Sequence, residues 1–497
     1  MKCIKINGAD TVAVAIVPLQ AGEVLRVGEQ EVTLLTDVPA GNKIALRDFS
    51  AGDDVVKYGF PIGHAIADIR TGELVNDKNL KTNLDGLLDY EYTPIGGDVA
   101  SLAAELPPRT FMGYRRADGG VGVRNEIWVV PTVGCVSGVA SELARRLREE
   151  TACRGVDAIV AFPHNFGCSQ LGDDHENTRK ILRDIILHPN AGGVLVVGLG
   201  CENNQPAALR EMLGDYDRER IRFMVTQETD DEMACGMEML RRIYEVARHD
   251  VRSEVPIGEL KIGLKCGGSD GLSGITANPL LGVLSDYVVA QGGTTVLTEV
   301  PEMFGAETLL MNRCHDRATF DKTVRLINDF KQFFIDNGQP IYENPSPGNK
   351  AGGISTLEEK SLGCTQKSGS SQVRDVIGYG DRLTTKGLNL LSAPGNDLVA
   401  STALAAAGCH MVLFSTGRGT PFGTFVPTVK ISTNSRLYAH KKGWIDFNAG
   451  VLVEGEPMAD VARRFVDYVA EVASGGRTNN ESNGYREISI FKTGVTL

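Results

Sequence analysis

Short runs of alternating apolar and polar residues fill the first 84 positions of the chain. TVAVAIVPL, EVTLLTDV and KIALRDF are examples, and Gly, Asp and Pro separate them. This pattern is typical of short strands joined by turns. We therefore predict a small β domain over residues 1–84. A linker is expected over residues 85–110, which contain Gly96, Gly97 and the pair Pro107-Pro108.

From residue 111 onward, short apolar runs alternate with patterns of helical period such as SGVASELARRLREE. This alternation predicts α/β domains with parallel sheets. Pro256 interrupts the pattern, so we expect a middle domain over residues 111–256 and a C-terminal domain over residues 257–497. The predicted strands are residues 127–133, 158–162, 194–197 and 223–226, then 261–264, 295–298, 388–391 and 411–414.

Three apolar runs end in Gly-Cys, at Cys135, Cys168 and Cys201, and each Cys follows the previous one by 33 residues. That spacing matches one strand–helix unit, so the thiols should lie at equivalent ends of neighbouring parallel strands. The run that ends at Cys266 repeats the pattern. Because ligands bind at the carboxyl ends of such strands, the pattern favours a metal or reactive-thiol site. The alternative is that each Cys is a small buried hydrophobe.

Composition narrows the class of protein. A chain of 497 residues with 42% hydrophobic residues can fill more than one core. No segment approaches the ~18 apolar residues of a membrane span, and ten cysteines are too sparse for a disulfide scaffold. A net charge of −12 without a basic stripe argues against nucleic acid as a partner. These features predict a cytoplasmic enzyme.

Several long motifs at the predicted strand ends resemble the altronate/galactarate dehydratase family of sugar-acid hydro-lyases. They include HNFGCSQLGDDHENTR, CGGSDGLSGITANP, TEVPEMFGAE and NPSPGNKAGGISTLEEKSLGCTQK. The resemblance covers essentially the full chain. It implies a β-clip (SAF-like) N-terminal domain, a middle dimerisation domain and a Rossmann-like C-terminal domain. It also implies a homodimer that converts D-altronate to 2-keto-3-deoxy-D-gluconate in hexuronate catabolism, dependent on Fe²⁺ with Mn²⁺ as a second candidate.

The N-terminal domain departs from the family pattern. Asn42, Asn76 and Lys78 stand where members of the family commonly have histidines. Either a contact to metal or substrate is lost in this chain, or these positions lie on a solvated edge.

The implied reaction removes a proton α to a carboxylate, and a divalent metal can stabilise the enediolate that forms. Thiolate and imidazole ligands suit iron. The candidate metal ligands are Cys135, Cys168, Cys201, Cys266, Asp270 and Cys364, with His164, Glu299 and Glu302 as further donors. No Cys-x-x-Cys or His-Glu-x-x-His spacing selects among them. Three thiols could alternatively hold an iron-sulfur cluster.

Acid, base and substrate-binding residues are expected in the same loops. The candidates for proton transfer are His164, His175, Glu299 and Glu302. Asp173 and Asp174 either join them or open the following helix. The candidates for binding the sugar acid are Arg124, Asn125, Lys350 and Arg418. Lys360 and Lys367 are further candidates for binding its carboxylate. Residues 344–372 are dense in Gly, Ser, Lys and Asn, so we expect a long functional loop with a short helix capped at Ser355.

The sequence leaves alternative functions open. One alternative is an NAD-dependent dehydrogenase. VGLGCENN has the first two glycines of a dinucleotide-binding fingerprint, but Asn203 replaces the third, so the sequence gives this alternative little support. A non-catalytic sugar-acid sensor is a further alternative, prompted by the missing histidines. Within the lyases, galactarate or another α-hydroxy acid such as sulfolactate is the alternative substrate.

Overall fold

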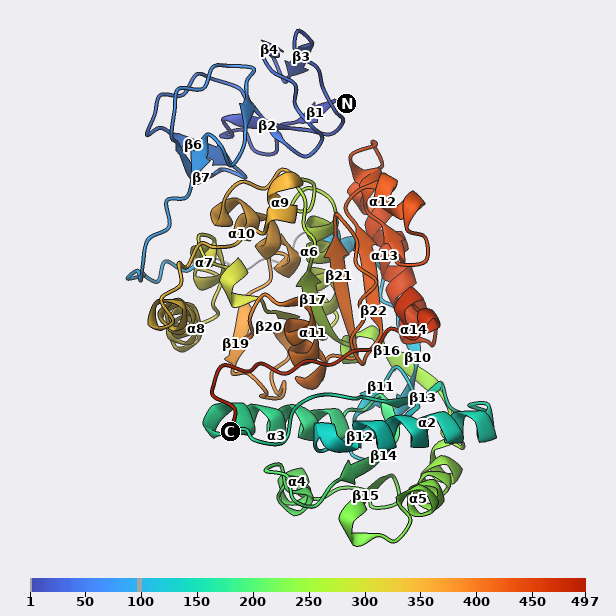
Figure 1. Ribbon diagram of the computed structural model, residues 1–497. Helices are drawn as coiled ribbons and strands as arrows, with labels where there is room; N and C mark the ends of the chain where they lie inside the picture. The colour runs from blue at the N-terminus through green and yellow to red at the C-terminus, as the bar shows by residue number, and fades with distance from the viewer. Residues whose placement is uncertain (1, 96–100) are drawn as a thin grey trace.

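The computed structural model describes residues 2–95 and 101–497, and the polypeptide forms three successive units (Figure 1). The first is the predicted small β domain. Its strands form a four-stranded antiparallel sheet (β1-β2-β5-β8), a hairpin (β3-β4) and a three-stranded sheet (β6-β7-β9). The strands are β1 Cys3–Ile4, β2 Val12–Ala15, β3 Val24–Val27, β4 Gln30–Thr33, β5 Lys43–Ala45, β6 Asp54–Lys57, β7 Phe60–Ala65, β8 Leu74–Val75 and β9 Leu80–Lys81.

The segment predicted as a linker is partly fixed against the C-terminal domain. The Tyr90 hydroxyl donates to Glu307 at 2.5 Å, and the Tyr92 hydroxyl donates to the carbonyl of Cys314 at 2.7 Å. A short helix follows, α1 Ser101–Glu105. Gly96 and Gly97 lie outside the described residues. Residues 85–95 therefore form a strap along the surface of the C-terminal domain.

The middle domain contains a four-stranded parallel sheet in the order β13-β12-β14-β15. Its elements are β12 Glu126–Pro131, α2 Ser137–Thr151, β13 Ala158–Ala161, α3 Gly172–Ile186, β14 Ala191–Gly198, α4 Pro206–Leu213, β15 Ile221–Val225 and α5 Glu232–Ala247. The four predicted strands are confirmed. A small antiparallel sheet that the sequence did not indicate adds β10 Thr110–Arg115, β11 Val121–Gly122 and β16 Ser253–Pro256.

The side chains of β12 point alternately into the core of the middle domain and toward the C-terminal domain. Ile127 and Val129 pack with Leu143 of α2 and Leu240 of α5 on one face. Trp128, on the other face, is fully buried and contacts Phe425 edge to face, with ring centroids 5.6 Å apart. Successive strand residues point to opposite faces, so one strand serves both cores. The two α/β domains consequently share an apolar interface, visible as the contact between α3 and the C-terminal domain in Figure 1.

The C-terminal domain is built on a seven-stranded parallel sheet in the order β19-β20-β18-β17-β21-β22-β23. The strands are β17 Lys261–Cys266, β18 Thr294–Leu297, β19 Val373–Ile377, β20 Gly387–Leu391, β21 Met411–Thr416, β22 Thr428–Ser432 and β23 Phe447–Asn448. The helices are α6 Ala277–Ala290, α7 Glu307–Met311, α8 Arg317–Asp336, α9 Pro347–Ala351, α10 Leu357–Thr365, α11 Asp397–Ala406, α12 Ser435–His440, α13 Met458–Ala473 and α14 Asn479–Asn483.

This sheet is buried on both faces. Leu264 and Leu413 pack with α6, α8 and α13, whereas Val296 and Val412 face α11. The α/β fold class and the four predicted strands of this domain are confirmed. None of the described helices combines the length and apolar character that crossing a membrane requires.

The expected long loop over residues 344–372 is mostly helical. α9 and α10 occupy its centre, and every residue of α10 is buried. Thr356, one residue beyond the predicted cap, accepts a hydrogen bond from the backbone N–H of Glu359. Small and polar residues mislead here because they permit close packing between helices as readily as they form loops.

Candidate active site

The candidate active site lies at the carboxyl ends of β17 and β18. Cys266 ends β17, and Glu299 follows β18. β18 lies on one side of β17 and β21 on the other, so the strand order reverses here, which is where open α/β sheets bind ligands. α9 and α10 lie between this edge and the N-terminal β domain (Figure 1).

Two glutamates at this edge are each paired with buried lysines. Glu299 pairs with Lys265 and with Lys367, the latter at 2.6 Å from Nζ to Oε2. Glu302, on the 3-10 turn Val300–Glu302, pairs with Lys360 of α10 at 2.8 Å. These five side chains are no more than 7% exposed, so the charges depend on one another for stabilisation.

The two glutamates differ in acidity. Burial raises the pKa of Glu299, and the neighbouring charge of Glu302 adds to the effect against the opposing lysines. Burial also opposes ionisation of Glu302, but Lys360, with Lys265 and Lys367, outweighs it and lowers the pKa of that carboxyl. Carboxyl groups whose pKa values are pushed apart are suited to separate acid and base roles.

Glu299 is also held in a strained backbone conformation. Its φ of +67° and ψ of +56° lie in the left-handed region, which costs a residue other than Gly about 1–3 kcal/mol. The backbone N–H of Cys266 donates to its carboxylate at 3.2 Å. Strain that the surrounding fold enforces is common at functional sites.

Cys266 and Cys364 form a buried pair of unlike thiols. A hydrogen bond from Cys364 holds the pKa of Cys266 well below its ordinary value, and burial does not overcome it. The same bond, followed by burial, raises the pKa of Cys364. Cys364 Sγ also lies 3.1 Å from Oε2 of Glu302. The site thus combines two buried thiols of opposite pKa shift with a carboxylate.

A cavity of about 610 Å³ opens beside these groups. Cys266, Glu302 and Lys360 form part of its wall. Further polar side chains that line it are Glu343, Asn344, Ser346, Asn349, Lys350, Asn396 and Asp397. Ammonium and amide groups around one cavity suit a small anion that carries hydroxyl groups.

The structure brings further predicted residues to this cavity. Lys350 lines it, and Arg418 is exposed and lies beside Gly268 and Gly348 at its margin. Asp270 instead accepts hydrogen bonds from Thr433 and Asn434, so its carboxylate holds loops together.

Asn42 and Asn76 line a neighbouring cavity of about 380 Å³, to which Lys350 also contributes. Two of the three positions that lack the family histidines therefore face a cavity beside the candidate site. Lys78 is not among the residues that line it.

The other predicted site residues belong to the middle domain and form a separate group. Cys135, Cys168 and Cys201 follow the adjacent strands β12, β13 and β14, and all three are exposed. Their predicted placement at neighbouring strand ends is confirmed. Cys266 and Cys364 belong to a different sheet, so the predicted thiols divide into two groups.

His164 does not have the surroundings of a proton-transfer residue. It is 6% exposed, its Nε2 lies 2.8 Å from the carbonyl of Pro131, and its Nδ1 accepts from the N–H of Phe166. Burial lowers its pKa to about 4. His164 is therefore a neutral ring that holds the loop before Cys168. His175, on α3, is half-buried, and its Nε2 has no hydrogen-bond partner among the described residues.

Arg124 and Asn125 are structural rather than substrate-binding residues. Arg124 is 2% exposed and pairs with Glu481 at 2.7 Å. Asn125 is fully buried and donates to the carbonyl of Ala247 at 2.8 Å. Neither side chain is accessible to a substrate, which corrects the interpretation from the sequence.

The C-terminal residues do not fit the single Fe²⁺ or Mn²⁺ ion implied by the family resemblance. Glu299 and Glu302 already bind ammonium groups, which would repel a cation, and Asp270 is saturated by hydrogen bonds. Within residues 2–95 and 101–497, no three His, Cys, Asp or Glu side chains are grouped to hold a metal ion. We therefore derive no chemical step through a metal at this cavity.

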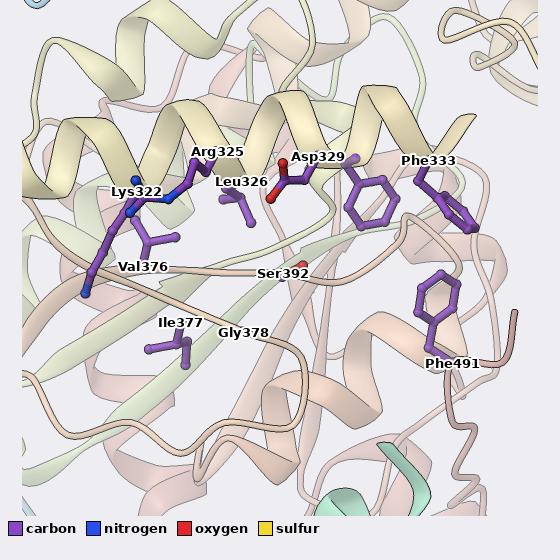
Figure 2. Close-up of a pocket in the computed structure, with 11 residues that line it drawn as sticks. Lys322, Arg325, Leu326, Asp329, Phe333, Val376, Ile377, Gly378, Ser392 and Phe491 are labelled. Carbon is purple, nitrogen blue, oxygen red and sulfur yellow. The ribbon is translucent and has the colours of Figure 1, made fainter. Parts of the chain in front are cut away.

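A further cavity, of about 460 Å³, lies between α8 and β19 and lacks comparable chemistry. Figure 2 shows its ring of side chains, with Phe491 below Phe333 of α8. Its charged side chains are Lys322, Arg325 and Asp329, and Lys322 is paired with Asp375 at 2.8 Å. Phe491 packs against Phe330 and Phe333, so this surface anchors the C-terminal segment.

Sequence reasoning missed two members of the charged network, Lys265 and Asp397, which pair at 2.8 Å. A lysine inside the apolar strand KIGLKC was the available signal, since a buried lysine requires a partner. Asp397 gave no signal beyond an ordinary helix start.

Three family models match successive parts of the chain. Residues 1–83 match the altronate/galactarate dehydratase SAF domain, residues 113–248 match the D-galactarate dehydratase/altronate hydrolase second domain, and residues 257–496 match the D-galactarate/altronate dehydratase C-terminal domain. The chain is 60% identical to altronate dehydratase of Escherichia coli (strain K12) over 100% of both chains. It is 58% identical to altronate dehydratase of Bacillus subtilis (strain 168) over 99% of both.

Galactarate dehydratase (L-threo-forming) of Escherichia coli (strain K12) is more distant, at 32% identity over 98% of this chain and 96% of that one. With all three regions matched and two full-length relatives this similar, the chain belongs to the altronate/galactarate dehydratase family.

Proposed function

We propose that this protein removes water from a sugar acid, with D-altronate as its preferred substrate, in the cavity beside Glu302. The observation that carries this proposal is the contact of 2.8 Å between Glu302 and Lys360 in the wall of a polar cavity. The preference for altronate rests on the relatives named altronate dehydratases, which are 58% and 60% identical to this chain.

The substrate carboxylate would bind to the ammonium groups of Lys350 and Lys360. Both line the cavity, and Lys360 lies close enough to Glu302 to bring the carboxylate next to it. Proton loss from C2 places a second negative charge on the substrate. Fixed ammonium groups in a site screened from water stabilise that charge.

Glu302 is the candidate base. In the free protein Lys360 contributes to the low pKa of its carboxyl. A substrate carboxylate competes for the same ammonium, so binding raises the basicity of Glu302 when the α-proton is within reach. The proton taken from C2 then passes to the departing 3-hydroxyl, which leaves as water. The resulting enol becomes the 2-keto-3-deoxy acid.

The position and charge of Glu302 also depend on three buried residues behind the cavity wall, Glu299, Lys265 and Lys367. They contact Glu302 electrostatically but do not line the cavity. The homodimer and the cytoplasmic location implied by the resemblance and composition remain expectations, and light scattering on the purified protein measures the first.

The test is an assay of the purified protein with D-altronate, galactarate and sulfolactate, scored by 2-keto-3-deoxy acid or sulfite release. We expect the highest kcat/KM with D-altronate and its loss in Lys360→Met. If only galactarate is turned over, galactarate replaces D-altronate as the proposed substrate. Equal rates in wild type and Lys360→Met would refute the proposal that the cavity beside Lys360 is the active site.

A further inference from the structure

The edge of the middle sheet carries three exposed thiols that the proposed reaction does not use. Cys135, Cys168 and Cys201 lie in the loops that follow three strands side by side in the sheet, in the order β13-β12-β14. Free cysteine is among the most buried residue types. Three accessible thiols on one edge therefore require an explanation other than packing.

The backbone fixes the loops that carry these thiols. The N–H of Gly134 donates to the carbonyl of Phe166 at 2.9 Å, which joins the first loop to the second. The N–H of Asn204 donates to the carbonyl of Gly167 at 3.0 Å, which joins the second to the third. Glu202 is 1% exposed and accepts from Thr132 and from the N–H of Gly200. The three loops thus form one connected unit.

The glycine before each cysteine is required by this geometry. A Cβ at Gly167 would lie 2.1 Å from the carbonyl oxygen of Thr132, and φ at Gly167 is +97°. A Cβ at Gly134 would lie 2.9 Å from the carbonyl oxygen of His164. At Gly200, φ is +127°. Each Gly-Cys pair therefore lets the loop turn tightly and leaves the thiol at the edge.

The spacing of the strands decides what kind of group these thiols suit. Adjacent strands lie about 4.8 Å apart, so three neighbouring ends span about 10 Å. The three loops extend from an edge of that width, and no three His, Cys, Asp or Glu side chains in the described part of the chain are grouped to hold a single metal ion. An iron-sulfur cluster is wider, because each thiolate binds a different iron and sulfides bridge the irons.

Two buried polar atoms in the segments that follow Cys168 and Cys201 lack hydrogen-bond partners among the described residues. Asn204 is 1% exposed, yet its Oδ1 has no hydrogen-bond partner among the described residues, and neither has Nε2 of His175. Buried polar atoms in folded proteins are normally satisfied. The C-terminal segment also ends here, because the N–H of Leu497 donates to the carbonyl of Ser169 at 3.0 Å and Asp174 caps Thr493 and Gly494.

We propose that Cys135, Cys168 and Cys201 hold an iron-sulfur cluster through three thiolates, leaving one iron without a protein thiolate. The other seven cysteines of the chain take no part. The cluster site is separate from the lysine and glutamate network of the C-terminal domain. It requires iron and sulfide but not the dehydratase reaction, so its presence is measured without substrate.

The test reconstitutes the full-length protein anaerobically with ferrous iron and sulfide, then measures bound iron, acid-labile sulfide and the electron paramagnetic resonance spectrum after reduction. We expect wild type to retain iron and sulfide together. Bound sulfide should fall at least about tenfold in each of the variants Cys135→Ser, Cys168→Ser and Cys201→Ser. Changing a residue that only hydrogen-bonds a metal ligand already lowers metal affinity by about 10- to 100-fold, and these variants remove a ligand itself.

Cys153→Ser is the matched control, because Cys153 lies between the end of α2 and the start of β13, at the amino ends of the strands of the same domain and so opposite the thiol edge. It should bind as much iron and sulfide as wild type. A second measurement needs no variant: iodoacetamide should label the three thiols in the apo protein and spare them in the reconstituted protein, as read by peptide mass spectrometry.

Iron without sulfide would overturn the cluster, as would sulfide that survives in all three thiol variants or equal labelling of the apo and reconstituted proteins. Failure of the sugar-acid assay alongside a bound cluster would refute only the proposed function. A working dehydratase without sulfide would refute only the cluster.

Discussion

The carboxylate of Glu302 lies 2.8 Å from the ammonium of Lys360, and both line the same cavity. Glu302 comes from the turn after β18 and Lys360 from the middle of α10, so the pair joins two elements at the edge of the C-terminal sheet. The lysine suppresses the basicity of the carboxylate until a substrate anion shares its charge. This relationship makes Glu302 the residue on which the proposed mechanism depends.

Glu302→Gln should lower kcat at least about a hundredfold, because general base catalysis contributes about 10²–10⁴. Glutamine keeps the shape of the side chain and no longer competes with the substrate carboxylate for Lys360, so KM should not rise. Steady-state kinetics measures both values. Glu454→Gln, on an exposed turn, is the control and should match wild type. A Glu302→Gln rate within threefold of wild type, about 0.6 kcal/mol, would remove Glu302 from the mechanism.

Lys43→Met should destabilise the attachment of the N-terminal domain. Lys43 Nζ lies 2.8 Å from Glu359 of α10, and both side chains are at most 1% exposed. Removing one partner of a buried pair costs about 3–5 kcal/mol. Because Lys57 still contacts Glu359, we expect the loss of stability to lie at the lower end of this range. Urea unfolding measures the loss, with the exposed Lys5→Met as control; an unchanged midpoint would show that the pair contributes nothing.

The same carboxylate predicts a dependence of stability on pH. Lys43 and Lys57 outweigh burial and hold the pKa of Glu359 at about 2, below its ordinary value of 4.5. A carboxyl group with a lowered folded-state pKa stabilises the fold fully above its unfolded pKa. That contribution should disappear as pH falls from about 4.5 toward 2. As pH is lowered through this window, the urea midpoint of Glu359→Gln should fall less steeply than that of wild type. Equal slopes in the two proteins would contradict the lowered pKa of Glu359.

Arg124 and Arg418 should respond to substitution in opposite ways. Arg124→Met leaves Glu481 buried without its bidentate partner and should cost about 3–5 kcal/mol of stability, with KM unchanged in the folded protein. Arg418→Met, at the margin of the cavity, should raise KM without changing the thermal midpoint. Thermal unfolding and kinetics on both variants check this. A raised KM in Arg124→Met would restore it as a substrate ligand.

The sequence alone determined the class of the fold and much of its order. Period-two and period-3.6 patterns are local, so the strands around Ile127, Val194, Leu264 and Val412 could be placed before any contact was known. The same holds for the three Gly-Cys turns, because a fixed spacing on successive strand–helix units places them on one edge. The family was identified from long motifs, and the comparisons confirm it.

Only the tertiary structure decided which polar residues share a site. Lys360 and Arg124 carry the same charge, yet one faces a cavity and the other is paired with Glu481, 357 positions away. Lys43 and Glu359 meet across 316 positions. The role of a charged side chain depends on its partner and on its exposure, and neither is encoded in the local pattern, whereas strand and helix periods are.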